Sequence, residues 1–158
     1  MVSPPVAISG NHQVEKFDCG RDSLNEWLKK RALKNELLMA SRTYVVCEDA
    51  RVIGYYCLAT GSIDHKEAPG RVKRNMPSPI PIMVLGRLAV DLEYQGMKLG
   101  KGLLKDAVLK TISVSQQVGL KGMLVHAADE SAYYFYKAHG FMECPNNPMT
   151  LILPISIS

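Results

Sequence analysis

Hydrophobic and polar positions follow two different periods along this chain. Five segments have the β-branched, aromatic or continuously apolar composition of strands: 42–49, 50–63, 82–91, 122–128 and 149–155. The first two are expected to form a hairpin that turns at residues 48–50. The third is long and apolar, which predicts a central strand. Gly86 inside it indicates a bulge or a close approach of two backbones.

Three other segments have the composition and punctuation of helices: 23–39, 101–118 and 129–140. The first is expected in one or two pieces, and Ser23 with Glu26 has the spacing of a capping box at its start. Gly140 is expected to end the last helix. Segment 68–81 is rich in proline, glycine and basic residues and is expected to be an exposed loop. The order of elements predicts a single mixed α/β (α+β) domain over residues 1–158.

The composition is consistent with this fold class and indicates where in the cell the protein is expected. The chain has 158 residues, of which 47% are hydrophobic and 22% charged, as in an ordinary globular protein. No apolar run approaches the roughly 20 residues that a membrane span needs. The N-terminal residues lack the basic and apolar regions of a secretory signal. A cytoplasmic protein is therefore expected.

The cysteines and histidines are scattered, with no spacing typical of a metal site. No metal is expected, and the four cysteines are expected to be reduced thiols. His126 falls in an apolar strand, where a hydrogen-bonded core histidine is the simpler interpretation. His139 precedes Gly140 and is expected to do no more than cap the helix C-terminus.

Basic residues are concentrated more than the net charge of +4 suggests. Two runs, at residues 29–34 and 71–74, contain most of the basic residues that are candidates for contacting a nucleic acid, and one more lies in a predicted strand. The candidates are Lys29, Lys30, Lys34, Arg71, Lys73, Arg74 and Arg87. Such runs are usually solvated faces. The alternative is a groove that contacts nucleic-acid phosphates without reading bases. Arg87 is unusual, because an arginine inside an apolar strand is costly unless it is paired.

The stretch YQGMKLGKGLL, residues 94–104, places three glycines and two lysines just before a helix. Glycine amides can approach a ligand closely, and a helix N-terminus favours an anion, usually phosphate. The spacing fits neither a dinucleotide loop nor a nucleoside-triphosphate loop. Two interpretations stay open: a turn whose glycines relieve strain, or a loop for the pyrophosphate of coenzyme A.

At this point the sequence resembles a known family. LAVDLEYQGMKLGKGLL is similar to the coenzyme A signature of the GNAT acetyltransferases, and YFYKAHGF is similar to their later helix, with a tyrosine four residues before Gly-Phe. Further segments across residues 11–154 resemble the TacT-like acetyltransferase toxins of type II toxin–antitoxin modules. The resemblance implies a GNAT fold with a mixed central sheet of about six or seven strands flanked by about four helices. It also implies acetyl-CoA as cosubstrate and the α-amine of an aminoacyl-tRNA as acceptor, so that translation is blocked.

The resemblance also implies roles for particular residues. The strand backbone is expected to hold the pantetheine and acetyl carbonyl through Leu88, Ala89 and Val90. The loop amides are expected to hold the pyrophosphate through Gln95, Gly96, Met97, Lys98, Leu99, Gly100 and Lys101. Tyr136 is expected to be the general acid for the coenzyme A thiolate, since an unperturbed phenol has a pKa of about 10 and is protonated at neutral pH. Tyr133, Tyr134 and Phe135 are expected to pack the helix.

Two positions depart from the family pattern. Lys98 replaces the middle glycine of the signature, which costs on the order of 1 kcal/mol if that position needs a positive φ. Its ammonium is alternatively placed to neutralise a phosphate. Asp129 stands where many relatives have asparagine, and no cofactor contact is assigned to it.

The expected partners follow from the same resemblance. They are aminoacyl-tRNA, a cognate antitoxin of the ribbon-helix-helix DNA-binding type, operator DNA reached only through a repressor complex with that antitoxin, and a second copy in a homodimer. The main alternative is a GNAT acetyltransferase for a small amine or protein amine, for which an acidic cleft is expected. A second alternative is a non-catalytic member that binds coenzyme A or a partner protein only. The sequence does not specify which aminoacyl-tRNA is used.

Overall fold

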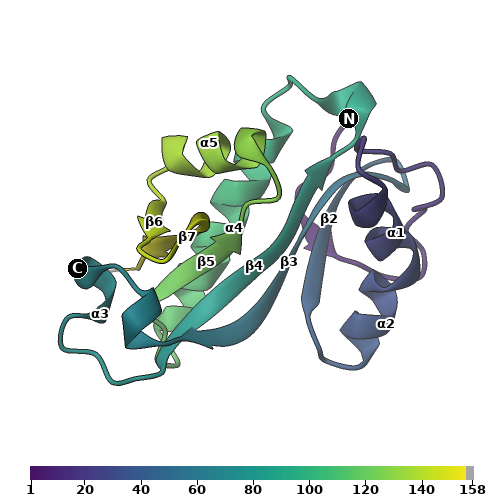
Figure 1. Cartoon of the computed structure of the whole chain (residues 1–158). Helices are drawn as coiled ribbons and strands as arrows, with labels where there is room; N and C mark the ends of the chain where they lie inside the picture. Colours follow the sequence, from purple (N-terminus) through teal and green to yellow (C-terminus); the bar gives the residue numbers. More distant parts are fainter. Residues whose placement is uncertain (156–158) are drawn as a thin grey trace. The chain divides into compact units, whose positions relative to one another are not determined.

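The computed structural model (Figure 1) describes residues 1–155. The chain divides into two compact units. Unit 1 contains Met1–Ala59 and Gly86–Ala107; unit 2 contains Thr60–Leu85 and the chain from Val108 onward. Strands β3 (Arg51–Ile63) and β4 (Ile80–Val90) and helix α4 (Leu99–Ser115) contribute residues to both. Each unit is described by itself.

Unit 1 is built on an antiparallel arrangement. Its other elements are β1 (Val6–Ala7), α1 (Asp22–Lys30), α2 (Ala32–Leu37), β2 (Arg42–Glu48) and the 3-10 turn η2 (Leu92–Tyr94). Strand β2 pairs antiparallel with both β1 and β3, and Tyr44 lies opposite Tyr56. Helices α1 and α2 follow one another, and α2 contacts β2 (Figure 1). Buried apolar residues under these helices, including Phe17, Leu28 and Tyr55, form the core of the unit.

Unit 2 contains the parallel pair of strands. Its elements are the 3-10 turn η1 (His65–Glu67), α3 (Gly70–Lys73), β5 (Gly122–His126), α5 (Glu130–Ala138), β6 (Met142–Cys144) and β7 (Asn147–Pro154). Residues Ile82–Leu85 of β4 pair in parallel with Gly122–Val125 of β5, and β7 pairs antiparallel with both β5 and β6. Through successive hydrogen-bonded neighbours the strand order is β1-β2-β3-β4-β5-β7-β6.

The expected mixed α/β class, the five strands and the three helical segments are confirmed, with the first helical segment in two pieces. Strands β1 and β6 have two and three residues and were not predicted. No helix within residues 1–155 is both long and apolar enough to cross a bilayer.

Two local predictions are wrong. The first helix begins at Asp22, and its N-cap is Arg21, which makes no side-chain cap bond; Ser23 is therefore already inside the helix. Glu26 instead forms an ion pair with Lys30, one turn away, at 2.8 Å.

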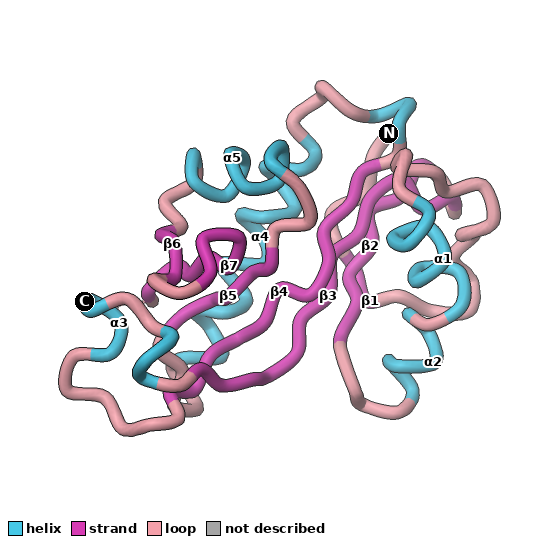
Figure 2. Tube along the Cα trace, viewed as in Figure 1, coloured by secondary structure: helices cyan, strands magenta, loops and turns pink. Residues whose placement is uncertain are grey.

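Segment 68–81 is also more than an exposed loop. It includes the short helix α3, which Figure 2 shows between two loops. Ala68, Val72 and Ile80 are fully buried in the core of unit 2. These three apolar side chains therefore anchor the segment, although most of its other residues face solvent.

Candidate active site

The glycine loop begins from a buried carboxylate at the end of β4. Asp91 is only 2% exposed and caps η2, because its side chain accepts a hydrogen bond from the Glu93 amide at 3.0 Å. It also accepts from the Asp18 amide at 3.1 Å and from Nη2 of Arg51 at 3.3 Å. These contacts tie the start of the loop to two other segments of unit 1. Asp91 was not predicted as a site residue, although an aspartate directly after an apolar strand is a signal in the sequence.

The side chain of Gln95 holds the start of the loop against neighbouring backbone. Its Nε2 donates to the carbonyl of Val90 at 2.9 Å and to that of Cys19 at 3.3 Å. The Gln95 side chain therefore braces the loop against the last residue of β4.

Two residues of the loop before α4 have a positive φ, in the left-handed region of the backbone. Gly96 has φ +82° and Lys98 has φ +66°, which is the condition under which lysine was expected to be strained. The Gly102 amide donates to the Lys98 carbonyl at 3.1 Å and closes the first helical bond. The amides of Leu99, Gly100 and Lys101 belong to that first turn and have no partner inside the helix.

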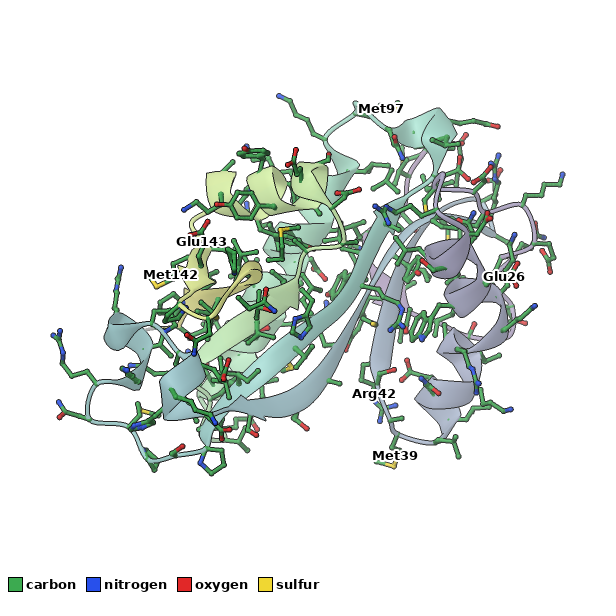
Figure 3. The ribbon with its side chains drawn as sticks, in the orientation of Figure 1. Glu26, Met39, Arg42, Met97, Met142 and Glu143 are labelled. Carbon is green, nitrogen blue, oxygen red and sulfur yellow. The ribbon has the colours of Figure 1, made fainter. Side chains whose placement is uncertain are left out.

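The surroundings of these amides suit an anion. The predicted loop residues Gly96, Met97 and Lys98 are exposed, and Met97 is labelled at the tip of the loop in Figure 3. Unpaired amides and the positive end of the helix dipole both favour negative charge at this position. The geometry supports the phosphate interpretation over a turn that only relieves strain.

The residues predicted to hold the pantetheine lie beyond the part of β4 that pairs with β5. Pairing with β5 covers Ile82–Leu85, whereas Leu88, Ala89 and Val90 follow it. Ala89 is buried, and the other two are half-buried. A Cβ on Gly86 would lie 3.1 Å from the Cys57 sulfur, so the close neighbour of this glycine is a side chain and not the second backbone that was expected.

Arg87 is stabilised by an aromatic ring. Its guanidinium carbon lies 4.5 Å from the centroid of the Trp27 ring, which stacks on Tyr55 at 5.9 Å and an interplanar angle of 8°. A cation–π contact of this kind offsets the cost of placing arginine in an apolar strand. Burial raises the pKa of the neighbouring Cys57 thiol, and the Arg87 charge acts in the opposite direction.

Tyr136 lies on the buried side of α5. It is 7% exposed, its ring centroid is 5.3 Å from that of Phe141, and its carbonyl accepts the Phe141 amide at 3.2 Å. The helix is capped by Asp129, which accepts the Ala132 amide at 2.8 Å and so has a structural role. Gly140 follows the helix end with φ +94°.

The other aromatic residues of α5 differ from one another. Phe135 is half-buried against His139 and Tyr136, as expected. Tyr133 donates to Glu143 of β6, which Figure 3 labels. Tyr134 is 65% exposed, so its assignment as a packing residue is wrong.

The two histidines also separate. His139 caps α5, with Nδ1 2.7 Å from the Phe135 carbonyl, which confirms the capping prediction. His126 is hydrogen-bonded through Nδ1 to Thr150 Oγ1 at 3.0 Å, but it is exposed at the end of β5 and is not a core residue. It lines a cavity of about 430 Å³ in unit 2.

The predicted tRNA residues fall into two groups. Unit 1 holds Arg87 and the exposed Lys29, Lys30 and Lys34 of α1 and α2; unit 2 holds Arg71, Lys73 and Arg74 in and after α3. Arg71 and Arg74 are exposed and Lys73 is half-buried. Within residues 1–155 no three histidine, cysteine or acidic side chains gather as a metal site, and all four cysteines are free.

Comparison with known proteins gives a consistent result. Residues 40–143 match the acetyltransferase (GNAT) domain family. The chain is 45% identical over 151 residues to a tRNA-acetylating toxin of Mycobacterium tuberculosis, which covers 96% of this chain and 91% of the relative.

Solved structures agree with the sequence match. AtaT complexed with acetyl-methionyl-tRNAfMet superposes with a TM-score of 0.90 at 28% identity, over 98% of this chain and 95% of that one. A mutant AtaT toxin bound to the C-terminus of the antitoxin AtaR and acetyl-CoA gives 0.84 at 28% identity, over 98% and 93%. The KacTA–DNA complex gives 0.82 at 27% identity, over 98% and 93%. The chain therefore belongs to the GNAT family of acetyltransferases, in the branch that contains the tRNA-acetylating toxins.

Proposed function

We propose that this GNAT acetyltransferase transfers the acetyl group of acetyl-CoA to the α-amine of an aminoacyl-tRNA and so acts as a toxin that blocks translation. The observation that carries the proposal is the 45% identity over 96% of the chain to a tRNA-acetylating toxin. A neighbour at TM-score 0.90 is complexed with an acetylated aminoacyl-tRNA. The phosphate-compatible loop after β4 supports the use of acetyl-CoA.

The loop is assigned to the pyrophosphate of the cosubstrate. The amides of Gln95–Lys101 would donate to its oxygens, and the backbone of Leu88–Val90 would hold the pantetheine arm and the acetyl carbonyl. The left-handed backbone at Gly96 and Lys98 turns the chain into the first turn of α4, where the helix dipole adds to the attraction.

Tyr136 is assigned as the general acid. The acceptor amine attacks the thioester carbonyl in its neutral form, the carbon–sulfur bond breaks, and the departing thiolate takes the phenolic proton. The amine proton passes to solvent, and solvent returns a proton to the Tyr136 phenolate. A general acid contributes roughly 100-fold to 10,000-fold to a rate. Tyr136→Phe keeps the ring against Phe141, and we expect it to lower the transfer rate at least about 100-fold. Tyr134→Phe, at an exposed position of the same helix, is the matched control.

The basic residues are assigned to the tRNA backbone. Contacts to phosphates rather than to bases are assigned to Arg71, Lys73 and Arg74 in unit 2 and to Lys29, Lys30, Lys34 and Arg87 in unit 1. The Arg87–Trp27 stack leaves a positive charge on a rigid strand. Such contacts predict binding that weakens steeply with salt.

One observation favours the alternative acceptor, a small amine. The cavity of unit 2 is lined by Asp64 and Glu67, as an acidic cleft for a cationic substrate would be. The relatives and the exposed basic residues favour tRNA instead. We therefore place the small amine second.

The partners are proposed from the same neighbours. AtaT is seen with the antitoxin AtaR, and KacTA with DNA. We assign to this chain a cognate antitoxin of ribbon-helix-helix type, contact with operator DNA through the resulting repressor complex, a homodimeric state and a cytoplasmic location.

A direct assay separates the two acceptors. Labelled acetyl-CoA is offered with charged tRNA, with the same tRNA after deacylation, and with a panel of free amines. The proposal expects label in charged tRNA only. Label in the free amines at equal or higher rate, with charged tRNA unlabelled, would overturn it.

A further inference from the structure

Unit 2 contains a cavity whose lining includes none of the residues assigned above to acetyl transfer to tRNA. Its volume is about 430 Å³, within the range of small-ligand pockets. Its walls come from the end of β3, η1, β4, β5 and the β6–β7 hairpin. Its apolar surface includes Ile82, Val84 and Leu124, and none of its described lining residues is lysine or arginine.

Two carboxylates, those of Asp64 and Glu67, line the cavity. Asp64 occupies the N-cap position of η1 but makes no side-chain cap bond. Glu67 ends the same turn and is half-buried. Within residues 1–155 neither has an ion-pair partner. Burial, and after it the charge of Glu67, raises the pKa of the Cys144 thiol, which keeps this third lining group neutral.

The walls are braced before any ligand arrives. Nδ1 of His126 is bonded to Thr150 Oγ1 at 3.0 Å, joining β5 to β7. Asn146 Nδ2 donates to the Lys66 carbonyl at 2.9 Å, joining the β6–β7 hairpin to η1. A preformed site spends less of its binding energy on ordering side chains.

The lining selects the chemistry of the ligand. Unpaired carboxylates repel phosphate, which excludes the tRNA backbone. The acidic, histidine and cysteine side chains do not gather as a metal site within the described residues, which disfavours a bare divalent cation. An apolar wall beside two carboxylates suits a methylene chain that ends in a positive charge, since such a chain buries its stem and keeps its charged head on the acids.

We propose that this cavity binds an aliphatic cation, with its ammonium or guanidinium head on the carboxylates of Asp64 and Glu67 and its stem against Ile82 and Leu124. The same chemistry is offered by a lysine or arginine side chain of a bound polypeptide and by a polyamine. Such binding requires no acetyl transfer, so its test is separate from that of the proposed function.

The test is a titration of protein labelled with carbon-13 at isoleucine, leucine and valine methyl groups, followed by NMR. N-acetyl-arginine amide and N-acetyl-lysine amide represent polypeptide side chains, spermidine represents polyamines, and N-acetyl-norleucine amide is the neutral control. Saturable shifts of the Ile82 and Leu124 methyls are expected with the cations, at a Kd at least about tenfold lower than with norleucine amide. The tighter cation class identifies the source.

Matched variants complete the design. Asp64→Asn with Glu67→Gln should raise the Kd of the cations at least about tenfold, whereas Glu15→Gln with Glu130→Gln, which removes the same charge at exposed positions elsewhere, should leave it within about twofold. Asp64→Asn alone, at an exposed position, serves if the double variant does not fold. Equal binding of norleucine amide, an unchanged Kd in the Asp64 and Glu67 variants, or no saturable shift up to about 10 mM would each overturn the proposal.

Discussion

Lys98 offers the sharpest test of how the glycine loop is built. Its backbone lies at φ +66°, in the left-handed region, where a side chain beyond glycine is strained. We compare Lys98→Gly with Lys98→Ala, because both remove the ammonium and only the first removes the Cβ. Any difference in stability between the two therefore reports the backbone.

The expected magnitude follows from two opposing effects. A left-handed L-residue costs roughly 1–2 kcal/mol. Glycine in turn lowers the free energy of unfolding by about 0.5–1 kcal/mol, because its unfolded chain has greater conformational freedom. The free energy of unfolding of Lys98→Gly should therefore exceed that of Lys98→Ala by about 0.5–1 kcal/mol.

Urea unfolding measures this difference, and calorimetric titration with acetyl-CoA measures the charge. Both variants should bind acetyl-CoA about two- to fivefold more weakly at low salt, and the loss should shrink at high salt. Lys105→Ala, at an exposed lysine about two turns further on in α4, is the control and should bind normally. Equal stability of the two Lys98 variants would refute the strain, and unchanged affinity would refute the phosphate contact.

Three further predictions concern the framework of the site. Burial, and next the hydrogen bond to Asp106, raises the pKa of Tyr56. The fold therefore favours the protonated phenol, and its contribution to the free energy of unfolding is complete below about pH 10 and falls by about 1.4 kcal/mol by pH 11. Urea midpoints at pH 8 and pH 11 should show a smaller loss of stability at alkaline pH in Tyr56→Phe than in the native chain. An equal loss in both would contradict this prediction. A Cβ on Gly122 would lie 2.8 Å from a backbone carbonyl of β7, so Gly122→Ala should lower the free energy of unfolding by about 1–3 kcal/mol, whereas Gly119→Ala, in open space, should not. Asp91→Ala leaves three donors without their acceptor and should weaken acetyl-CoA binding as well as lower the melting temperature; normal binding by a destabilised variant would show that Asp91 does not position the loop.

The sequence predicted what depends on local pattern. The strands of 42–63 and the helix before Gly140 were recognisable because their composition and punctuation agree with the final fold. The loop at 94–104 was recognisable as a candidate phosphate loop because glycines, lysines and a helix start coincide there. The structure adds that Lys98 does take up the left-handed backbone on which the predicted strain depended.

Features that depend on contacts between distant segments were not predictable. Asp91 meets Asp18 and Arg51, which are 73 and 40 residues away in sequence. The cavity acids Asp64 and Glu67 appear ordinary in the sequence, and only the folded strands around them form a site. Strands β1 and β6 are too short to carry a period, and Ser23 matched a capping box that the helix start at Asp22 does not use.

The central claim is that the acceptor is the α-amine of an amino acid esterified to tRNA. After reaction with acetyl-CoA, the charged tRNA is digested with ribonuclease and the aminoacyl-adenosine is analysed by mass spectrometry. We predict an added acetyl group on the α-amine with the native chain and almost none with Tyr136→Phe. Aminoacyl-adenosine that stays unmodified while a free amine becomes acetylated, or a Tyr136→Phe variant as active as the native chain, would contradict the account.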